Sequence, residues 1–353
     1  MSRDRRRRPA VVRRGGVRRG VRRSGASWSP RDIAASAFAF TEETPLEHGF
    51  AHVFRDRIVP ILRRQETRRQ VMRRKALAGI GVSALAGAGA AAGSFMQGFD
   101  NGIFIAPVFA VAAAIGSYGY FQNKWTTGLV SEVIPVMCDF LGGMRYGGPA
   151  LSPAEFADLG VVPTHTGARL DDTVSGSHDG RGFSLTEARL TTRSSSGKGR
   201  TRTTTVFRGL LIRIELAGEA PSITFARDRG GLANRLGEAF SPVRQGRQRI
   251  ETGSADFEAL YETYTDNPAA ARRFITSRLT DGLLEIARAE TGAERYIAAA
   301  TRGRGFYLAI PRSDDFLRLG SLFRPRNISE DDFHQCLADL ALPRRVIEAL
   351  GTG

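Results

Sequence analysis

The chain has 353 residues, of which 51 are Lys or Arg and 36 are Asp or Glu, for a formal net charge of +15. Residues 1–75 carry 21 basic against 7 acidic side chains, whereas residues 151–353 carry 28 against 26. The basic character therefore belongs to the front of the chain and does not indicate a nucleic-acid-binding fold. Cys138 and Cys336 lack zinc-site spacing, so we expect both to be core thiols in a reducing compartment.

Residues 1–31 form an arginine-rich tail that is predicted to be disordered. Residues 1–25 contain 11 Arg, one acidic residue and almost no large apolar side chain, so this segment cannot bury a core and is predicted to be disordered. Such a tail can attract anionic lipid or bind nucleic acid loosely. The plainer alternatives are a solvated extension and a start codon assigned too far upstream.

An amphipathic juxtamembrane helix is predicted over residues 46–75. Apolar side chains recur at steps of three and four from Leu46 to Leu62, which places them on one face. A basic block follows, directly before an uncharged run, and positive charge in that position stays on the cytoplasmic side of a membrane. We expect the block to contact lipid through Arg68, Arg69, Arg73, Arg74 and Lys75.

A transmembrane helical hairpin is predicted over residues 76–123, with spans at 76–97 and 102–123. Asp100 is the single ionisable residue between two uncharged runs, 76–99 and 101–123. At about 1.5 Å per residue, a helix over either run crosses a hydrocarbon core of about 30 Å. The alternative is a helical hairpin buried in the core of a soluble protein.

The first span is rich in Ala and Gly. Gly89 and Gly93 stand four residues apart, a small-xxx-small spacing that lets another helix backbone approach closely. We therefore expect helix pairing at these two glycines, with a protein partner or with a second copy of the chain.

A second juxtamembrane helix is predicted over residues 124–143, with its apolar residues on one face. It can pair with the 46–75 helix beneath the bilayer or lie flat on the lipid. Because the basic block and Lys124 flank the two spans on the same side, both termini are predicted to be cytoplasmic. The expected location is a cell membrane, crossed twice.

Residues 151–353 are predicted to form a cytoplasmic domain. Its strands come in runs rather than in alternation with helices, which favours an α+β fold of mostly antiparallel strands packed with helices. Gly197-Lys198-Gly199 lacks the flanking residues of a phosphate loop and is interpreted as a basic hairpin tip. Strands are expected at 183–192, 203–216, 222–226 and 247–252, a hairpin around 302–304, and helices at 257–264, 268–289, 329–340 and 344–350.

Five short motifs follow the hairpin in order: 171–176 (DDTVSG), 183–188 (FSLTEA), 206–210 (VFRGL), 264–268 (YTDNP) and 306–311 (FYLAIP). Together they resemble the uncharacterised bacterial membrane-protein family catalogued as domain of unknown function 3137, over residues 46–325. The resemblance implies two membrane spans followed by a cytoplasmic domain, in a bacterial inner membrane. It implies no activity.

The nearest approach to a chemical constellation lies between residues 171 and 187. Carboxylates and an imidazole at this density could bind a divalent cation or perform acid–base catalysis. The alternative is a polar turn before a strand. The candidate residues are Asp171, Asp172, His178, Asp179 and Glu187, and the sequence predicts no cofactor and no dedicated metal motif.

Two functions are compatible with these features. The favoured one is a membrane-anchored, non-enzymatic binding or scaffolding module, whose partners are the bilayer and another protein or a second copy. Nucleic acid is not expected as a partner. The alternative is a membrane-tethered hydrolase or metal-dependent enzyme that uses residues 171–187.

Overall fold

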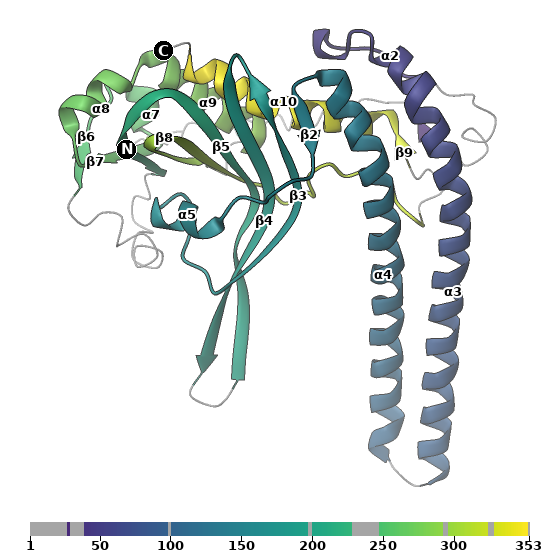
Figure 1. Ribbon diagram of the computed structural model, residues 1–353. Coiled ribbons are helices and arrows are strands. Elements are labelled where there is room, and N and C mark those ends of the chain that lie inside the picture. Colours follow the sequence, from purple (N-terminus) through teal and green to yellow (C-terminus); the bar gives the residue numbers. More distant parts are fainter. Residues whose placement is uncertain are drawn as a thin grey trace, which may run out of the picture.

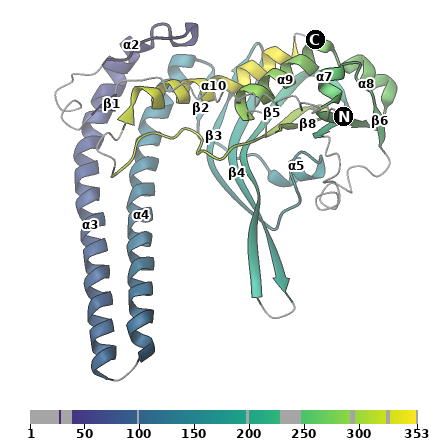
Figure 2. The ribbon, with the colours of Figure 1, turned by 180° about the vertical axis from the view of Figure 1, so that it is seen from behind.

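The structure is a computed structural model that describes residues 27–28, 39–97, 100–196, 200–227, 247–291, 296–323 and 328–351. It consists of a long two-helix hairpin beside an antiparallel sheet domain covered by helices (Figures 1 and 2). This arrangement confirms the α+β class predicted from the sequence.

The predicted tail, apart from two residues, and the predicted hairpin tip at 197–199 lie outside the described residues. The two residues, Ser27–Trp28, form β1 and pair antiparallel with β9, Ile328–Ser329. The structure differs here from the predicted disorder, because this pairing joins opposite ends of the chain and no local pattern announces it.

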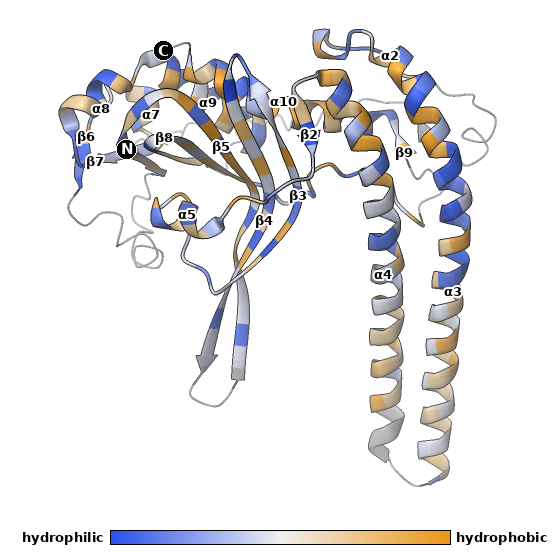
Figure 3. Ribbon diagram, viewed as in Figure 1, coloured by the Kyte–Doolittle hydropathy of each residue, from blue (hydrophilic) through white to orange (hydrophobic). Residues whose placement is uncertain are grey.

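The hairpin is formed by α3, Val59–Met96, and α4, Asp100–Leu141. With 38 and 42 residues, these helices are about 57 and 63 Å long, roughly twice the thickness of a hydrocarbon core. The stretches Phe50–Met96 and Ile105–Leu141 are both long and apolar enough to cross a membrane. Each juxtamembrane helix is thus continuous with its span, and Figure 3 shows hydrophilic residues concentrated in the half of α3 nearest the sheet domain.

The chain enters α3 through three short turns: η1, Pro45–Glu47, α2, Phe50–Val53, and the π-turn η2, Phe54–Ile58. Pro60 is the second residue after the π-turn. Because proline has no N–H and its ring crowds the carbonyl four residues earlier, the wider π-turn accommodates it without breaking the helix.

We call the parts of α3 and α4 nearest the connection between them, about residues 77–96 and 100–117, the free half of the hairpin. Small residues bring the two helices together there. A Cβ atom added at Gly79 would lie 2.4 Å from Ser117 Oγ, and one added at Gly87 would lie 2.3 Å from Ala110 Cβ. Both distances are shorter than real Cβ contacts, so the two backbones approach as closely as glycine permits.

Gly89 and Gly93, the predicted pairing residues, do not take part in this contact. No described atom outside their own helical surroundings lies within 4 Å of a Cβ added at either position. Pairing of Gly89 and Gly93 with a helix of another chain stays a prediction.

The opposite halves of the two helices pack on each other and on the sheet domain. Arg57 of η2 lies 2.9 Å from Asp139 of α4, and Arg64 of α3 lies 3.5 Å from Glu132 of α4. The apolar side chains of these halves are buried with the main core, among them Ile61, Leu62, Met72, Ala76, Trp125, Leu129, Val133, Ile134 and Met137.

The sheet is built around β5, Arg200–Arg227. Along one edge β5 pairs first with β4, Arg181–Ser196, and then with β7, Tyr261–Thr265. Its other edge pairs with β8, Ala298–Pro311. The sheet continues from β4 through β3, Gly167–His178, to β2, Met144–Tyr146, and from β7 to β6, Gln248–Ile250, with every pairing antiparallel.

Alternating side chains of β5 enter two cores. Leu210 and Ile212 face the main core, which the sheet shares with the hairpin base and four helices, whereas Leu211 faces a smaller core under α5 that includes Phe156 and Tyr307. The helices of the domain are α5, Pro153–Asp158, α7, Ala255–Glu258, α8, Pro268–Phe274, α9, Ser277–Thr291, and α10, Glu330–Leu350.

Several local predictions were wrong. The helix predicted over residues 268–289 is interrupted at residues 275–276 and forms α8 and α9. Residues 261–265 form a strand rather than the end of a helix, because Tyr261, Thr263 and Thr265 alternate inward against the edge of β5. β8 runs without a turn through 302–304, where Gly303 takes a positive φ of 56° beside an irregular register. The last helix is continuous, with Pro343 inside it.

The contact at Gly87 provides a test of the hairpin geometry. Gly87→Ile should push α3 away from Ala110 and destabilise the hairpin by about 1–3 kcal/mol, the usual effect of overpacking. Gly81→Ile is the control, since no described atom lies within 4 Å of its added Cβ. Thermal unfolding in detergent, followed by circular dichroism, measures both variants, and equal midpoints would contradict this packing.

Candidate functional site

The structure divides the five candidate residues into two groups. Asp171 and Asp172 occupy an irregularity in β3, where the register with β4 shifts between Leu170 and Thr173, and Glu187 lies opposite them on β4. His178 ends β3 and Asp179 begins the turn that follows. Six residues of strand separate Asp172 from His178, about 20 Å, so the five side chains do not form one site.

The second group lies beside the last turn of α10. His178 Nε2 is 3.7 Å from Asp179 Oδ2 and 3.5 Å from Glu348 Oε1. Asp179 and Glu348 line an adjoining cavity of about 260 Å³, together with Arg181 and Arg278. This group is a polar turn with local ion pairs, as the plainer interpretation of the sequence predicts.

Glu187 is the centre of the first group. Its side chain is buried, 8% exposed, and its Oε2 accepts a hydrogen bond from the Phe316 N–H at 3.3 Å. Burial raises the pKa of Glu187 to about 7, and the nearby charges of Asp315, Asp172 and Asp171 act in the same direction. This carboxyl therefore keeps its proton to a higher pH than an exposed glutamate does.

Asp172 shares this environment. The Tyr146 hydroxyl, from β2, donates a hydrogen bond to Asp172 Oδ1. Burial raises the pKa of Asp172, and this hydrogen bond only partly offsets the effect. The other two acids are paired outside the cluster: Asp315 with Arg208, and Asp171 with Arg169 at 3.0 Å.

Glu187 and Asp172 have raised pKa values, and a general acid or base must be able to exchange protons. Glu187, however, is enclosed, and its outward oxygen is bound to the backbone of another segment. Among the residues that the structure describes, no group of three or more His, Cys, Asp or Glu side chains has a metal-holding arrangement. The geometry is that of a proton-binding site inside a structural junction.

The segment that covers Glu187 is residues 312–323, which follow β8 and form neither helix nor strand; we call it the strap. It is anchored by apolar side chains, since Phe316, Leu317, Leu319 and Leu322 are all at most 2% exposed. Leu317 takes a positive φ of 53°, which lets the strap bend tightly over the sheet.

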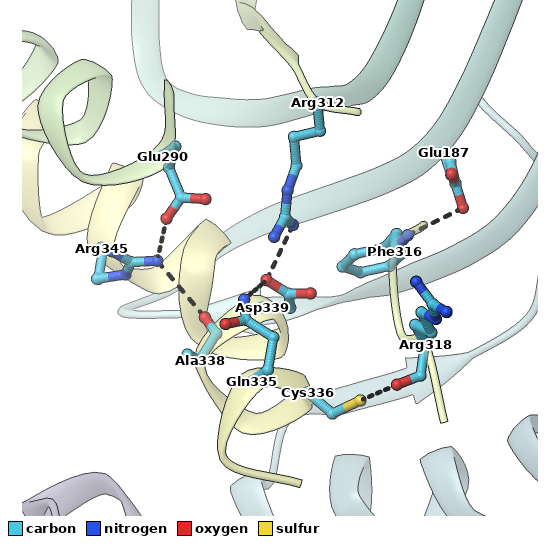
Figure 4. Close-up of polar contacts among 10 residues, drawn as sticks. All are labelled: Glu187, Glu290, Arg312, Phe316, Arg318, Gln335, Cys336, Ala338, Asp339 and Arg345. Atoms are coloured by element: carbon cyan, nitrogen blue, oxygen red, sulfur yellow. Dashed lines mark hydrogen bonds and ion pairs between the residues drawn. The ribbon is translucent and has the colours of Figure 1, made fainter. Parts of the chain in front are cut away.

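Buried polar contacts secure the strap at its start (Figure 4). Arg312 Nη1 lies 2.9 Å from Asp339 Oδ1 on α10, and both side chains are largely buried. Asp339 Oδ1 also accepts a hydrogen bond from Gln335. The Arg318 carbonyl accepts a weak contact from Cys336 Sγ, so α10 holds the strap along its length.

The far end of the strap contacts the hairpin. Arg69 Nη1 on α3 donates to the Leu322 carbonyl at 2.9 Å, and the Leu322 N–H donates to Gln122 Oε1 on α4 at the same distance. Phe323 stacks on Tyr118 of α4, with ring centroids 4.7 Å apart. The strap therefore connects the Glu187 carboxyl to both hairpin helices.

Arg69 is held by a second charge. Its guanidinium makes two hydrogen bonds to Glu66, of 2.7 and 2.8 Å, and the two side chains are 3% and 7% exposed. Arg69 thus departs from the prediction that it contacts lipid, because its charge is neutralised inside the protein. The other four members of the basic block, Arg68, Arg73, Arg74 and Lys75, are exposed on α3.

A second junction lies at the opposite end of the hairpin base. Glu47 Oε1 lies 2.7 Å from His334 Nδ1 on α10, with both side chains buried. The Arg344 side chain, also on α10, donates to the carbonyls of Leu141 and Gly142 at the end of α4. The sheet domain is therefore attached to the helices at both ends of their polar halves.

Sequence reasoning missed the strap and its contacts. The signal present was a run of apolar residues between Phe316 and Leu322, whose spacing matches neither a helix nor a strand. Nothing local in the sequence indicated that this run would reach Arg69, which lies some 250 residues earlier.

The fold and this junction define a class of protein: a long helical hairpin with an antiparallel α+β domain docked on one half of it. Residues 205–352 match the model of a family described as a protein of unknown function, DUF3137. The match confirms, over those residues, the resemblance drawn from the sequence, and it spans β5 to α10 with the strap included. No curated protein and no solved structure matches the chain.

The raised pKa of Glu187 predicts a pH dependence. Because the folded pKa of about 7 exceeds the ordinary 4.5, the folded state keeps a proton that the unfolded state releases, and the stability it supplies is lost as pH rises through about 7. Glu187→Gln should raise stability at pH 8, by at most about 3 kcal/mol, and flatten the profile between pH 4.5 and 7.

Thermal unfolding of the purified chain in detergent across this pH range measures the effect. The control is Glu285→Gln, which removes an exposed carboxylate from α9 and should leave the profile unchanged. An unchanged profile for Glu187→Gln would contradict the proton-binding assignment.

The Arg69–Glu66 pair predicts a double-mutant effect. Arg69→Met leaves the Glu66 carboxylate buried without a cation and should destabilise the chain by about 3–5 kcal/mol. Adding Glu66→Leu should restore most of this loss, because both charges are then gone. Arg73→Met, in the exposed part of the block, is the matched control.

Thermal midpoints measure these variants, and limited proteolysis within the strap reports whether its contact with α3 is lost. Equal effects of Arg69→Met and Arg73→Met would show that the pair does not secure the strap.

Proposed function

We propose that this protein is a membrane-anchored, cytoplasmic binding or scaffolding module of a bacterial inner membrane, with both termini in the cytoplasm. The observation that carries the proposal is the apolar surface on the free half of the hairpin. No described part of the chain covers these side chains, which include Leu85, 75% exposed, and Phe109, 71% exposed. An uncovered apolar surface of this extent is what a hydrocarbon environment requires.

The two halves of the hairpin differ in their exposed side chains, and this difference favours a bilayer, rather than another protein, as the surroundings of the free half. Exposed apolar side chains occur all around the free half: Leu77, Val82, Leu85, Phe95, Met96, Ile105, Val108, Phe109, Val111 and Ile115. Helices that are apolar around their whole circumference are typical of membrane spans, whereas a docking helix shows one stripe.

The boundary residues support the orientation. Arg73, Arg74 and Lys75 are exposed on α3 where the free half begins, and Lys124 lies at the equivalent level of α4. Tyr118 and Tyr120 are also exposed there, and the Lys124 ammonium lies 5.6 Å from the Tyr120 ring. Aromatic and basic residues together favour the cytoplasmic headgroup layer, and they are on the sheet-domain side.

The binding role follows from how the domain is attached. It is joined to the helices by buried contacts at Arg69, Glu47 and Arg344, so it is presented to the cytoplasm in one orientation. The enclosed acidic cluster favours a structural junction over a reaction centre. Another protein or a second copy is the expected partner, with the hairpin face around Gly89 and Gly93 as one place for it.

The enzyme alternative retains one specific observation, the raised pKa of Glu187. If this carboxyl acts as a general acid or base, the strap must move, because the Phe316 N–H now donates to Glu187 Oε2. Metal analysis of the purified chain tests the metal-dependent form: stoichiometric divalent metal that is lost on Asp172→Ala would favour an enzyme.

Reporter fusions test the proposed topology. A reporter fused after Gly353 should be active only in its cytoplasmic form, because two spans return the chain to the side of its basic block. A truncated fusion after Gln97, which keeps one span, should show the periplasmic form. Periplasmic activity of the full-length fusion would overturn the proposed orientation, and a full-length chain extracted from membranes by carbonate would overturn the anchor.

A further inference from the structure

β4 and β5 continue beyond the sheet as a two-stranded ribbon, formed by residues 191–196 and 200–205. The pairing of β3 with β4 ends at Thr191, and the pairing of β8 with β5 ends at Gly209, but the β4–β5 register continues to Ser196 and Arg200. At about 3.4 Å per residue the ribbon extends about 17 Å past its neighbours. It projects in the same direction as the free half of the α3–α4 hairpin (Figures 1 and 2).

The ribbon has no core to explain its length. Between Thr191 and Thr205 the sequence contains no apolar side chain, and its described side chains beyond Thr192 are all exposed. A polar two-stranded ribbon is only marginally stable alone in water. Some contact outside the described chain is therefore expected to favour it.

The charge of the ribbon is of one sign. No Asp or Glu occurs between Glu187 and Glu215, a stretch that contains seven Arg and Lys residues. Arg193 and Arg202 are exposed on the two strands of the ribbon, surrounded by threonine and serine hydroxyls. Guanidinium groups bind phosphate oxygens in pairs of hydrogen bonds, and hydroxyls add further donors.

We propose that the ribbon binds the anionic phospholipid headgroups of the leaflet that the hairpin enters. This inference rests on the proposed membrane anchor, because the ribbon projects toward the side of the protein that would face the bilayer. An anionic leaflet attracts basic groups within about a Debye length of it. The absence of apolar side chains favours headgroup contact over insertion into the hydrocarbon. The ribbon is thus a second attachment point to the membrane and fixes the tilt of the sheet domain.

The experiment uses the full chain in bilayer discs, made either from phosphatidylcholine alone or with phosphatidylglycerol added, each with a trace of headgroup spin-labelled lipid. A fluorophore is attached at Ser195→Cys, an exposed ribbon position. Cys138 and Cys336 are at most 1% exposed, so the new thiol is the reactive one. The spin label quenches the fluorophore only when the ribbon lies at the headgroups.

Quenching is expected in the anionic discs, and it should be lost in Arg193→Ser/Arg202→Ser and in about 0.5 M salt. Arg272→Ser/Arg273→Ser removes the same charge from exposed positions on α8 and should leave quenching unchanged. A label at Glu219→Cys, exposed elsewhere on β5, should not be quenched.

Equal quenching in both lipid compositions, or quenching that survives the double substitution in the ribbon, would overturn the proposal. Release of the ribbon by an added RNA oligonucleotide would also overturn it and would assign the basic ribbon to nucleic acid. Migration of the chain with the discs in gel filtration is read first, so failure of the anchor is distinguished from failure of the ribbon to bind lipid.

Discussion

The rest of the structure depends on one mismatch of length: α3 and α4 are about twice as long as an apolar bilayer core is thick. In the proposed membrane anchor, one half of each helix would therefore lie outside the hydrocarbon, and it is on this half that the sheet domain packs. Arg69 is an example, because its guanidinium is enclosed by Glu66 and by the Leu322 carbonyl. An arginine that served only to orient the helix in a membrane would be solvated instead.

The strap is the segment that connects the sheet domain to both hairpin helices. It begins at a buried ion pair with Asp339, passes over the Glu187 carboxyl, and ends between Arg69 and Tyr118 on the two hairpin helices. One continuous segment therefore contacts both Glu187 and the hairpin: its Phe316 N–H donates to Glu187, and its Leu322 N–H donates to Gln122 on α4.

The candidate residues show how far local sequence reasoning reaches. Asp172 and Glu187 do lie on neighbouring strands in one acidic environment, but His178 was grouped with them only by proximity in sequence, and a strand of six residues carries it about 20 Å away. Likewise the small-residue spacing of the first span predicted helix pairing at Gly89 and Gly93, which stays a prediction, whereas within the chain the close approach of α3 to α4 falls on Gly79 and Gly87. Composition indicates that a face is small, and only geometry decides which face meets the neighbour.

The sequence by itself determined the features that depend on local composition and period: two apolar helices separated by Asp100, the basic boundary before them, the α+β character of the remainder and its resemblance to a family that residues 205–352 match. Tertiary structure alone decided which polar groups are buried. The raised pKa of Glu187 and the enclosure of Arg69 both result from burial under segments more than a hundred residues away along the chain. Burial of this kind is a property of packing, which periodicity along the chain does not encode.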